Sequence, residues 1–306
     1  MTIPSTPSPS APSDAPDAPD TADTPGTAVA PDTPLAAVRA RPGAGLSAAL
    51  GVFVLLAGWA LWPSLFSAHD PLTGDTAQVL VPPGTEHWFG TDHLGRDLHS
   101  RVVHGASLTL RATFLAVGLG ALAGGALGLV SGFAGGRTDG FLMRCVDVVQ
   151  AVPGLLLSMA VITVLGFGTV NVAVAVGVSF VAAFARVTRA EVLRVSTATY
   201  VEAARAGGVR WGGVLVRHVL PNSAGPVLSL AAVQFGQAVL AVSALSFLGF
   251  GAAPPAPEWG SLVAEGRDYM VTAWWLTTLP GLVVVATVLS THRISRAFDP
   301  ETRRPV

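Results

Sequence analysis

The stretch SLTLRATFLAVGLGALAGGALGLVSGF at residues 107–133 decides the fold of this chain. Arg111 is its only charged residue, and the other side chains are apolar, small or hydroxylated. A helix that crosses the hydrocarbon core of a membrane needs about 20 consecutive, mostly apolar residues. The stretch therefore predicts a transmembrane helix.

Four glycines in this stretch recur at every fourth residue. Gly120, Gly124, Gly128 and Gly132 lie on one face of the predicted helix. Residues this small let a second helix approach closely, as in many membrane helix pairs. We expect this face to pack against another span, with contact to a ligand as the alternative.

The rest of the chain has the same apolar character. Hydrophobic residues make up 51% of the 306 residues and charged residues only 12%, whereas soluble domains carry roughly 25% charged residues. Further candidate spans are residues 45–66, 148–167, 170–185, 226–250 and 273–291. The sequence thus predicts an all-α integral membrane protein, a six-span helical bundle in which Pro153, Pro226 and Pro280 mark kinks or span ends.

The arginines indicate the orientation of the spans, and the chain has no lysine. Cytoplasmic loops of membrane proteins carry an excess of Arg and Lys. With the N-terminus inside, only Arg96, Arg101, Arg111 and Arg267 fall outside or at an outer edge. We therefore expect both termini in the cytoplasm.

The spans divide the chain into parts with different roles. Residues 1–38 are rich in Pro, Ala, Ser, Thr and Asp and contain no basic residue. This composition predicts a disordered cytoplasmic tail rather than a signal peptide. The other expected parts are a first transmembrane helix (45–66), an external segment (67–106), a five-span core (107–292) with a cytoplasmic loop (189–222), and a cytoplasmic C-terminal tail (293–306).

The cytoplasmic loop contains YVEAARAGGVRWGGVLVRHVLPN at residues 200–222. Good helix formers up to Ala206 predict one short helix, Gly207 and Gly208 predict a turn, and the amphipathic segment before Pro221 predicts a second helix. Two roles fit this helix–turn–helix equally well on physical grounds. It could lie on the lipid surface with its arginines toward anionic head groups, or it could dock a protein.

The EAA triplet at residues 202–204, Gly208 and the Leu-Pro pair at 220–221 are spaced in a way that resembles the EAA…G…LP loop of ABC importer permeases. In that family the loop forms a coupling helix that fits a cleft on a cytoplasmic ATPase subunit. The resemblance assigns an ATPase-coupling role to Glu202, Ala203, Ala204, Gly208, Leu220 and Pro221. Additional glycines, at 207, 212 and 213, depart from the family pattern and predict a coupling helix that is either short or ordered only when docked.

Four other segments are similar to dipeptide, oligopeptide and nickel importer permeases. They are HWFGTDHLGRDLHSRVVHGASLTL (87–110), RCVDVVQAVPGLLL (144–157), SFLGFGAAPPAPEWGSLVAEGRDY (246–269) and AFDP (297–300). The resemblance covers about residues 45–300 and is greatest for the C-type partner of the two permease subunits.

By this resemblance the chain is a permease subunit of an ATP-driven importer in the bacterial cytoplasmic membrane, moving dipeptides or oligopeptides. The implied partners are a second permease in a heterodimer, two cytoplasmic ATPase subunits and an external solute-binding protein, in a lipid bilayer and without nucleic acid. The chain has no GxxxxGK[ST] motif, so we expect no catalytic residue and no bound cofactor, with ATP and Mg held by the partner ATPases. Nickel or another small solute is the alternative substrate, and a stand-alone secondary transporter or a membrane scaffold is the alternative class.

Three groups of polar residues are further candidates for a site. In the external segment, we expect Asp92, Gly95, Arg96 and Asp97 to form a tight turn held by an Arg–carboxylate pair. The four nearby histidines at 87, 93, 99 and 104 lack the i, i+4 spacing of helical metal ligands, so no metal site is predicted.

Within the spans, Gln234 and Gln237 are expected either to line a pathway or to form hydrogen bonds between helices. Asp147 has Arg144 three residues before it, and this spacing predicts a local ion pair rather than a proton relay.

Overall fold

The structure, a computed structural model, describes residues 42–209 and 211–298. The expected disordered tail at residues 1–38 and the end of the expected C-terminal tail lie outside these residues. The regular structure described is helical, apart from two isolated β-bridges in the external segment. The helices are α1 (Pro42–Leu61), α2 (Leu98–Ala134), α3 (Gly136–Ala151), α4 (Gly154–Leu165), α5 (Thr169–Ser196), α6 (Thr199–Ala206), α7 (Trp211–Val214), α8 (Leu220–Phe247), α9 (Trp259–Gly266) and α10 (Trp275–Phe298).

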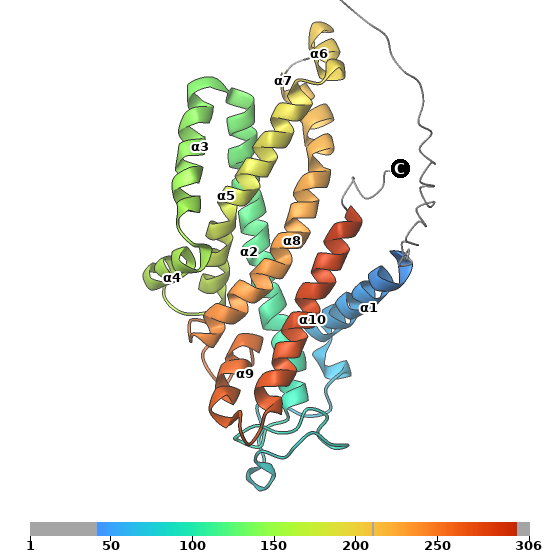
Figure 1. Cartoon of the computed structure of the whole chain (residues 1–306), viewed down its shortest axis with the longest axis vertical. Coiled ribbons are helices and arrows are strands. Elements are labelled where there is room, and N and C mark those ends of the chain that lie inside the picture. The colour runs from blue at the N-terminus through green and yellow to red at the C-terminus, as the bar shows by residue number, and fades with distance from the viewer. Residues whose placement is uncertain (1–41, 210, 299–306) are drawn as a thin grey trace, which may run out of the picture. The chain divides into compact units, whose positions relative to one another are not determined.

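The long helices α2, α5, α8 and α10 form a bundle, as Figure 1 shows. At one end of this bundle lie α6 and α7, and at the other lie the external segment and α9. Trp259, at the start of α9, is fully buried, and its indole N–H donates to the carbonyl oxygen of Val102 in α2 at 2.9 Å. This contact joins α9 to α2 at this end of the bundle.

The apolar helices agree with a membrane protein, but their number differs from a simple count of segments. The four helices α2, α5, α8 and α10 are each long and apolar enough to cross a membrane. Helices α3 and α4 reach that length and apolar character only together, as a pair bent by 93°. The described residues thus provide four spans, or five if the bent pair is one span. A shorter apolar helix, Gly45–Leu61, precedes them.

The kink expected at Pro153 within residues 148–167 is present, because the chain breaks between α3 and α4. Val152 leaves the helix with extended backbone angles (φ −89°, ψ 128°), and Pro153 follows it. A residue before proline is disfavoured in the helical region, and proline itself has no N–H to donate. Pro226 and Pro280, in contrast, lie inside α8 and α10, which continue past them.

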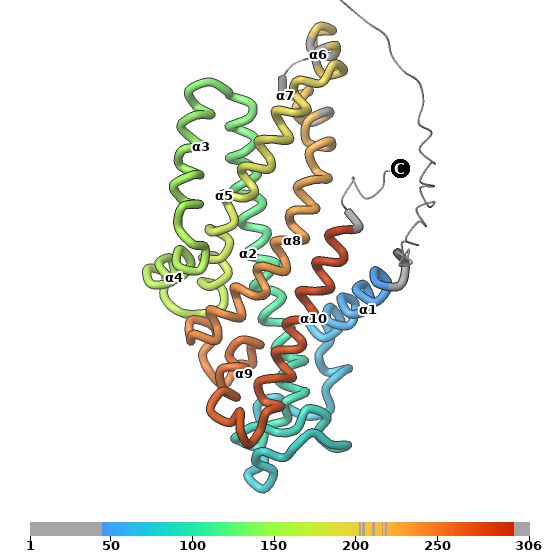
Figure 2. Tube along the Cα trace, in the orientation of Figure 1, coloured from blue at the N-terminus to red at the C-terminus, as the bar shows by residue number. Residues whose placement is uncertain are grey.

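The glycine face of α2 packs on α5, which confirms the expected helix contact. Figure 2 shows the two helices side by side. A Cβ atom on Gly120 would lie 2.8 Å from the Cβ atom of Phe180, and one on Gly128 would lie 2.5 Å from the carbonyl oxygen of Ala185. A Cβ atom on Gly124 would collide with the carbonyl oxygen of Val181. Any larger side chain on this face would push the two helices apart.

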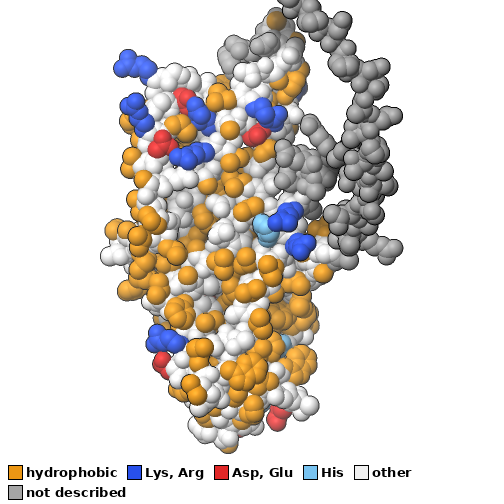
Figure 3. All heavy atoms as spheres, viewed as in Figure 1, with side chains coloured by type: hydrophobic (Ala, Val, Ile, Leu, Met, Phe, Trp, Pro, Cys, Tyr) orange, Lys and Arg blue, Asp and Glu red, His pale blue; other side chains and the backbone are white. Residues whose placement is uncertain are grey.

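The surface of the bundle is strongly apolar between its two ends. Figure 3 shows hydrophobic side chains over the middle of the visible face, and arginines gathered at the end where α3 and α6 lie. Leu122, Val148 and Val164 each expose 70% or more of their surface. Contiguous exposed apolar surface of this kind is typical of contact with lipid or with another subunit.

The close contact of α2 with α5 predicts that Gly124→Ala destabilises the protein. The new methyl group meets the backbone of α5, and overpacking of this kind costs about 1–3 kcal/mol. We expect a lower thermal unfolding midpoint of the purified chain in detergent. Gly118→Ala, in the same helix with no atom within 4 Å of its new Cβ, is the matched control and should not lower the midpoint. Equal midpoints for the two variants would contradict this account.

Candidate functional site

The loop at residues 189–222 forms a helix–turn–helix between α5 and α8, as the sequence predicted. α6 has 8 residues and α7 has 4, so both helices are short. Between them, Gly207 N–H donates to the carbonyl oxygen of Ala203 at 2.9 Å, and Gly208 has a φ of +85°. This left-handed backbone conformation favours glycine. A π-helical turn, Leu215–Val219, then continues into α8, with Leu220 and Pro221 in its first turn.

Buried valines attach this loop to the bundle. Val201 of α6, Val214 of α7 and Val219 of the π-helical turn are fully buried against the end of α5. Leu129 and Phe133, near the end of α2, pack on the same cluster. The loop is therefore held against both α2 and α5.

The opposite side of the loop presents small residues to the exterior. Ala203, Ala206, Gly207 and Gly208 are exposed, and a Cβ atom on Gly208 would have nothing within 4 Å. Side chains this small let the backbone of a partner approach closely. The side chains of Glu202 and Ala204 lie outside the described residues, although their backbone belongs to α6.

Two ion pairs at the same end connect α3 with α5. Arg189 donates to both oxygens of Asp139, with Nε–Oδ1 at 2.5 Å and Nη2–Oδ2 at 2.6 Å. Asp147 pairs with Arg186 of α5 at 2.6 Å, not with Arg144, so the expected local pair is wrong. The partner that the carboxylate finds is 39 positions away in the chain, which the helical spacing alone could not show.

In the external segment, the structure brings together Asp92 and Arg96 in a compact turn. One oxygen of Asp92 accepts backbone N–H groups from Leu94 and Arg96 at 2.8 and 3.0 Å. Its other oxygen accepts from Arg96 Nε and from Arg101 Nη1, both at 2.7 Å. Gly95 makes the turn with a φ of +72°, and a Cβ atom there would collide with the carbonyl oxygen of Asp75.

The same arginines connect this turn to α9. Arg101 Nη2 lies 3.1 Å, and Arg96 Nη2 lies 3.3 Å, from the carboxylate of Glu265. Arg101 is fully buried, so its charge is balanced almost entirely by Asp92 and Glu265. The sequence drew attention to Asp92 and Arg96 but not to Glu265, which lies 169 positions beyond Arg96 in the chain.

These contacts also control the charge of Asp92. Burial alone would raise the pKa of this carboxyl group, but the backbone N–H groups of Arg96 and Leu94 and the charges of Arg101 and Arg96 outweigh it and hold the pKa below its ordinary value. Asp92 therefore remains ionised and available to both arginines. Asp97 belongs to a separate contact: it caps α2 by accepting the Ser100 N–H at 2.7 Å.

The two glutamines of α8 lie at least partly on the surface of the bundle. Gln237 is exposed and Gln234 is half-buried. Within residues 42–209 and 211–298, no hydrogen bond to either amide group is present, so the structure provides no interhelical partner for them in this chain.

Comparison with known proteins agrees with these features. Residues 124–304 match the family described as "binding-protein-dependent transport system inner membrane component". The chain is 35% identical over 238 residues to a probable D,D-dipeptide transport system permease protein of Escherichia coli (strain K12), covering 78% of this chain and 80% of that protein. It is 36% identical over 260 residues to a di/tripeptide transport system permease protein of Pseudomonas aeruginosa (strain UCBPP-PA14), covering 82% of this chain and 86% of that protein.

Solved structures show the same fold at lower identity. An inward-facing methionine ABC transporter aligns with a TM-score of 0.53 and 20% identity, over 65% of this chain and 96% of that chain. An amino acid ABC transporter aligns with a TM-score of 0.52 and 16% identity, over 66% and 94% of the two chains. The chain belongs to the binding-protein-dependent inner membrane transport family, the permease subunits of ABC importers.

The buried charge network predicts a large cost for Arg101→Met. The change leaves Asp92 and Glu265 without their shared buried partner, and breaking a buried ion pair in this way costs about 3–5 kcal/mol. The thermal unfolding midpoint of the purified chain should fall accordingly. Arg267→Met is the control, because Arg267 and its partner Asp268 are both exposed and such pairs contribute about 0–1 kcal/mol. A midpoint for Arg101→Met close to that of Arg267→Met would argue against the network.

Proposed function

We propose that this chain is the permease subunit of a peptide importer and that the loop formed by α6 and α7 is the surface on which an ATPase subunit docks. The observation that carries this proposal is the construction of the loop. Its buried valines attach it to α2 and α5, while its other side exposes small residues at the arginine-rich end of the bundle. A merely solvated loop would need neither feature.

Short peptides are the proposed substrate class. The relatives described above are named for D,D-dipeptides and for di- and tripeptides, and a further relative, 36% identical over 266 residues, is a glutathione permease of Pectobacterium atrosepticum. Glutathione is itself a tripeptide. These names favour a peptide over nickel or another small solute.

The proposed topology has six spans with both termini in the cytoplasm. It counts α1, the bent pair α3–α4, and the four long helices as one span each. The distribution of arginines supports it, because Arg137 and Arg144 lie on α3, and Arg186, Arg189 and Arg194 lie in the half of α5 that leads into the loop. The disordered cytoplasmic tail at residues 1–38 remains a prediction from composition.

The proposed assembly is a heterodimer with a second permease, two cytoplasmic ATPase subunits that hold ATP and Mg, and an external solute-binding protein. Movement of the ATPases would displace α6, and the valine cluster would pass this displacement to α2 and α5. Gln234 and Gln237, on the outer side of α8, are the proposed polar contacts along the pathway. Glu202, Ala203, Ala204, Gly208, Leu220 and Pro221 keep the coupling role that their motif predicts.

Ala203→Arg tests the docking surface. Ala203 is exposed, so a long charged side chain there should not disturb the bundle but should obstruct a closely docked partner. We expect at least about a tenfold loss of ATPase co-purification, the effect of roughly 1.4 kcal/mol in binding, and a parallel loss of peptide uptake.

The matched control is Ala134→Arg, an exposed alanine at the end of α2 on the same side of the proposed membrane. This variant should retain co-purification and uptake. The thermal unfolding midpoint should be unchanged in both variants. If Ala203→Arg retained both co-purification and uptake, the loop would not be the docking surface.

A further inference from the structure

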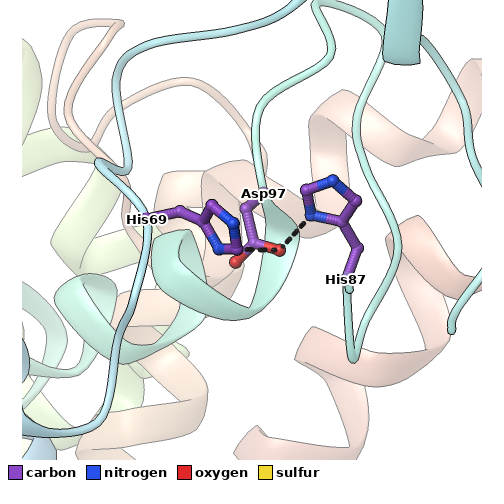
Figure 4. A group of neighbouring side chains, drawn as sticks. All are labelled: His69, His87 and Asp97. Atoms are coloured by element: carbon purple, nitrogen blue, oxygen red, sulfur yellow. Dashed lines mark hydrogen bonds and ion pairs between the residues drawn. The ribbon is translucent and has the colours of Figure 1, made fainter. Parts of the chain in front are cut away.

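A second group of polar side chains lies in the external segment, beside the network around Asp92. His69, from the segment after α1, and His87, from later in the same segment, turn their rings toward Asp97 at the start of α2, as Figure 4 shows. The Nδ1 atom of His87 lies 2.8 Å from Asp97 Oδ1, and that of His69 lies 4.0 Å from the same oxygen. Expectations based on helical spacing missed this group, because both histidines lie outside helices.

The surroundings of His87 are suited to a metal ion. Its Nε2 atom lies 2.5 Å from the amide oxygen of Gln78, and its Nδ1 atom faces the Asp97 carboxylate, so both ring nitrogens face acceptors. A neutral imidazole carries only one N–H. In the tautomer whose Nε2–H donates to Gln78, the lone pair on Nδ1 points toward Asp97 Oδ1, so the nitrogen and the carboxylate oxygen can coordinate one metal ion together. A histidine that ligates a metal is typically oriented by such a bond from its other nitrogen.

The cavity in front of these residues is acidic. It has a volume of about 280 Å³ and is lined by Asp70, Asp75 and Glu86 in addition to the three residues of the group. No arginine lines it. The other external group with metal-ligating atoms, Asp92, His93 and Glu265, differs in this respect, because its carboxylates already pair with Arg96 and Arg101.

We propose that His69, His87 and Asp97 bind a divalent transition-metal ion of the Zn²⁺ class. Imidazole nitrogens and one carboxylate oxygen suit such an ion, which takes three protein ligands and keeps a fourth position for water. The three ligand atoms lie within 4.8 Å of one another, and His69 is exposed enough to rotate inward. Water or one of the cavity's carboxylates supplies the remaining position.

The site uses atoms that the fold leaves available. Asp97 caps α2 through Oδ2, whereas Oδ1 faces the two histidines. A bound ion would thus join two points of the long external segment to the first turn of α2 without disturbing the helix cap. It would stabilise the external segment by cross-linking it, independently of any ATPase at the other end of the bundle.

Binding of Zn²⁺ alone to the purified full-length chain in detergent tests the site, by equilibrium dialysis with elemental analysis at pH 7.5. Wild type should bind one ion per chain. His69→Ala, at an exposed position, and Asp97→Asn, which keeps an oxygen for the helix cap, should each weaken binding by about tenfold or more. His292→Ala, an exposed histidine on α10, is the control and should bind like wild type.

Thermal unfolding provides a second readout. Zn²⁺ should raise the unfolding midpoint of wild type and of His292→Ala, but not that of His69→Ala. Equal Zn²⁺ affinity in wild type and His69→Ala would overturn the proposal, since the ion would then lie elsewhere. An absence of stoichiometric binding would also overturn it and would leave the contact of His87 with Asp97 as a structural hydrogen bond.

Discussion

The close approach of α2 to α5 is the constraint on which the rest of the described bundle depends. Glycine at every fourth residue lets the backbones meet, so that even a methyl group on Gly124 would strike the α5 carbonyl groups. In lipid, helix association gains little from the hydrophobic effect and relies on such tight packing. Because the contact extends from Gly120 to Gly132, it aligns the two helices over several turns and leaves little freedom for one to slide along the other.

This pair of helices connects the two ends of the protein. At the external end, α2 carries Arg101, which holds Asp92 and Glu265 in one buried network. At the other end, α2 and α5 together form the surface against which the valines of the loop are buried. Arg189 adds α3 to the same unit through Asp139. The loop, the bundle and the external segment are therefore parts of one packed body.

Much of this was predictable from the sequence, and the exceptions share a physical cause. Local patterns identified α2, its glycine face, the break at Pro153 as a kink, and the helix–turn–helix of the loop. Contacts between distant positions were not predictable: Asp147 pairs with Arg186, not Arg144, and Glu265 completes the Asp92 network. The angle of the bend at Pro153 also depends on tertiary packing, which the local sequence does not specify. Helix α5 continues to Ser196, beyond its apolar residues, where tertiary packing and ion pairs support it. His69 and His87 come together because of the path of an irregular segment, and no sequence periodicity predicts such a path.

The division of labour within the loop also bears on how such permeases diversify. The residues that hold the loop in place are buried valines, whereas the residues that face outward, such as Ala203 and Gly207, make few demands on the bundle. If the loop docks an ATPase as proposed, partner recognition and folding are encoded at different positions of one short segment. After gene duplication, a copy could drift toward a new ATPase by changing its outward residues alone. Cells that run several importers side by side could keep their subunits from mixing in this way, without rebuilding the membrane core.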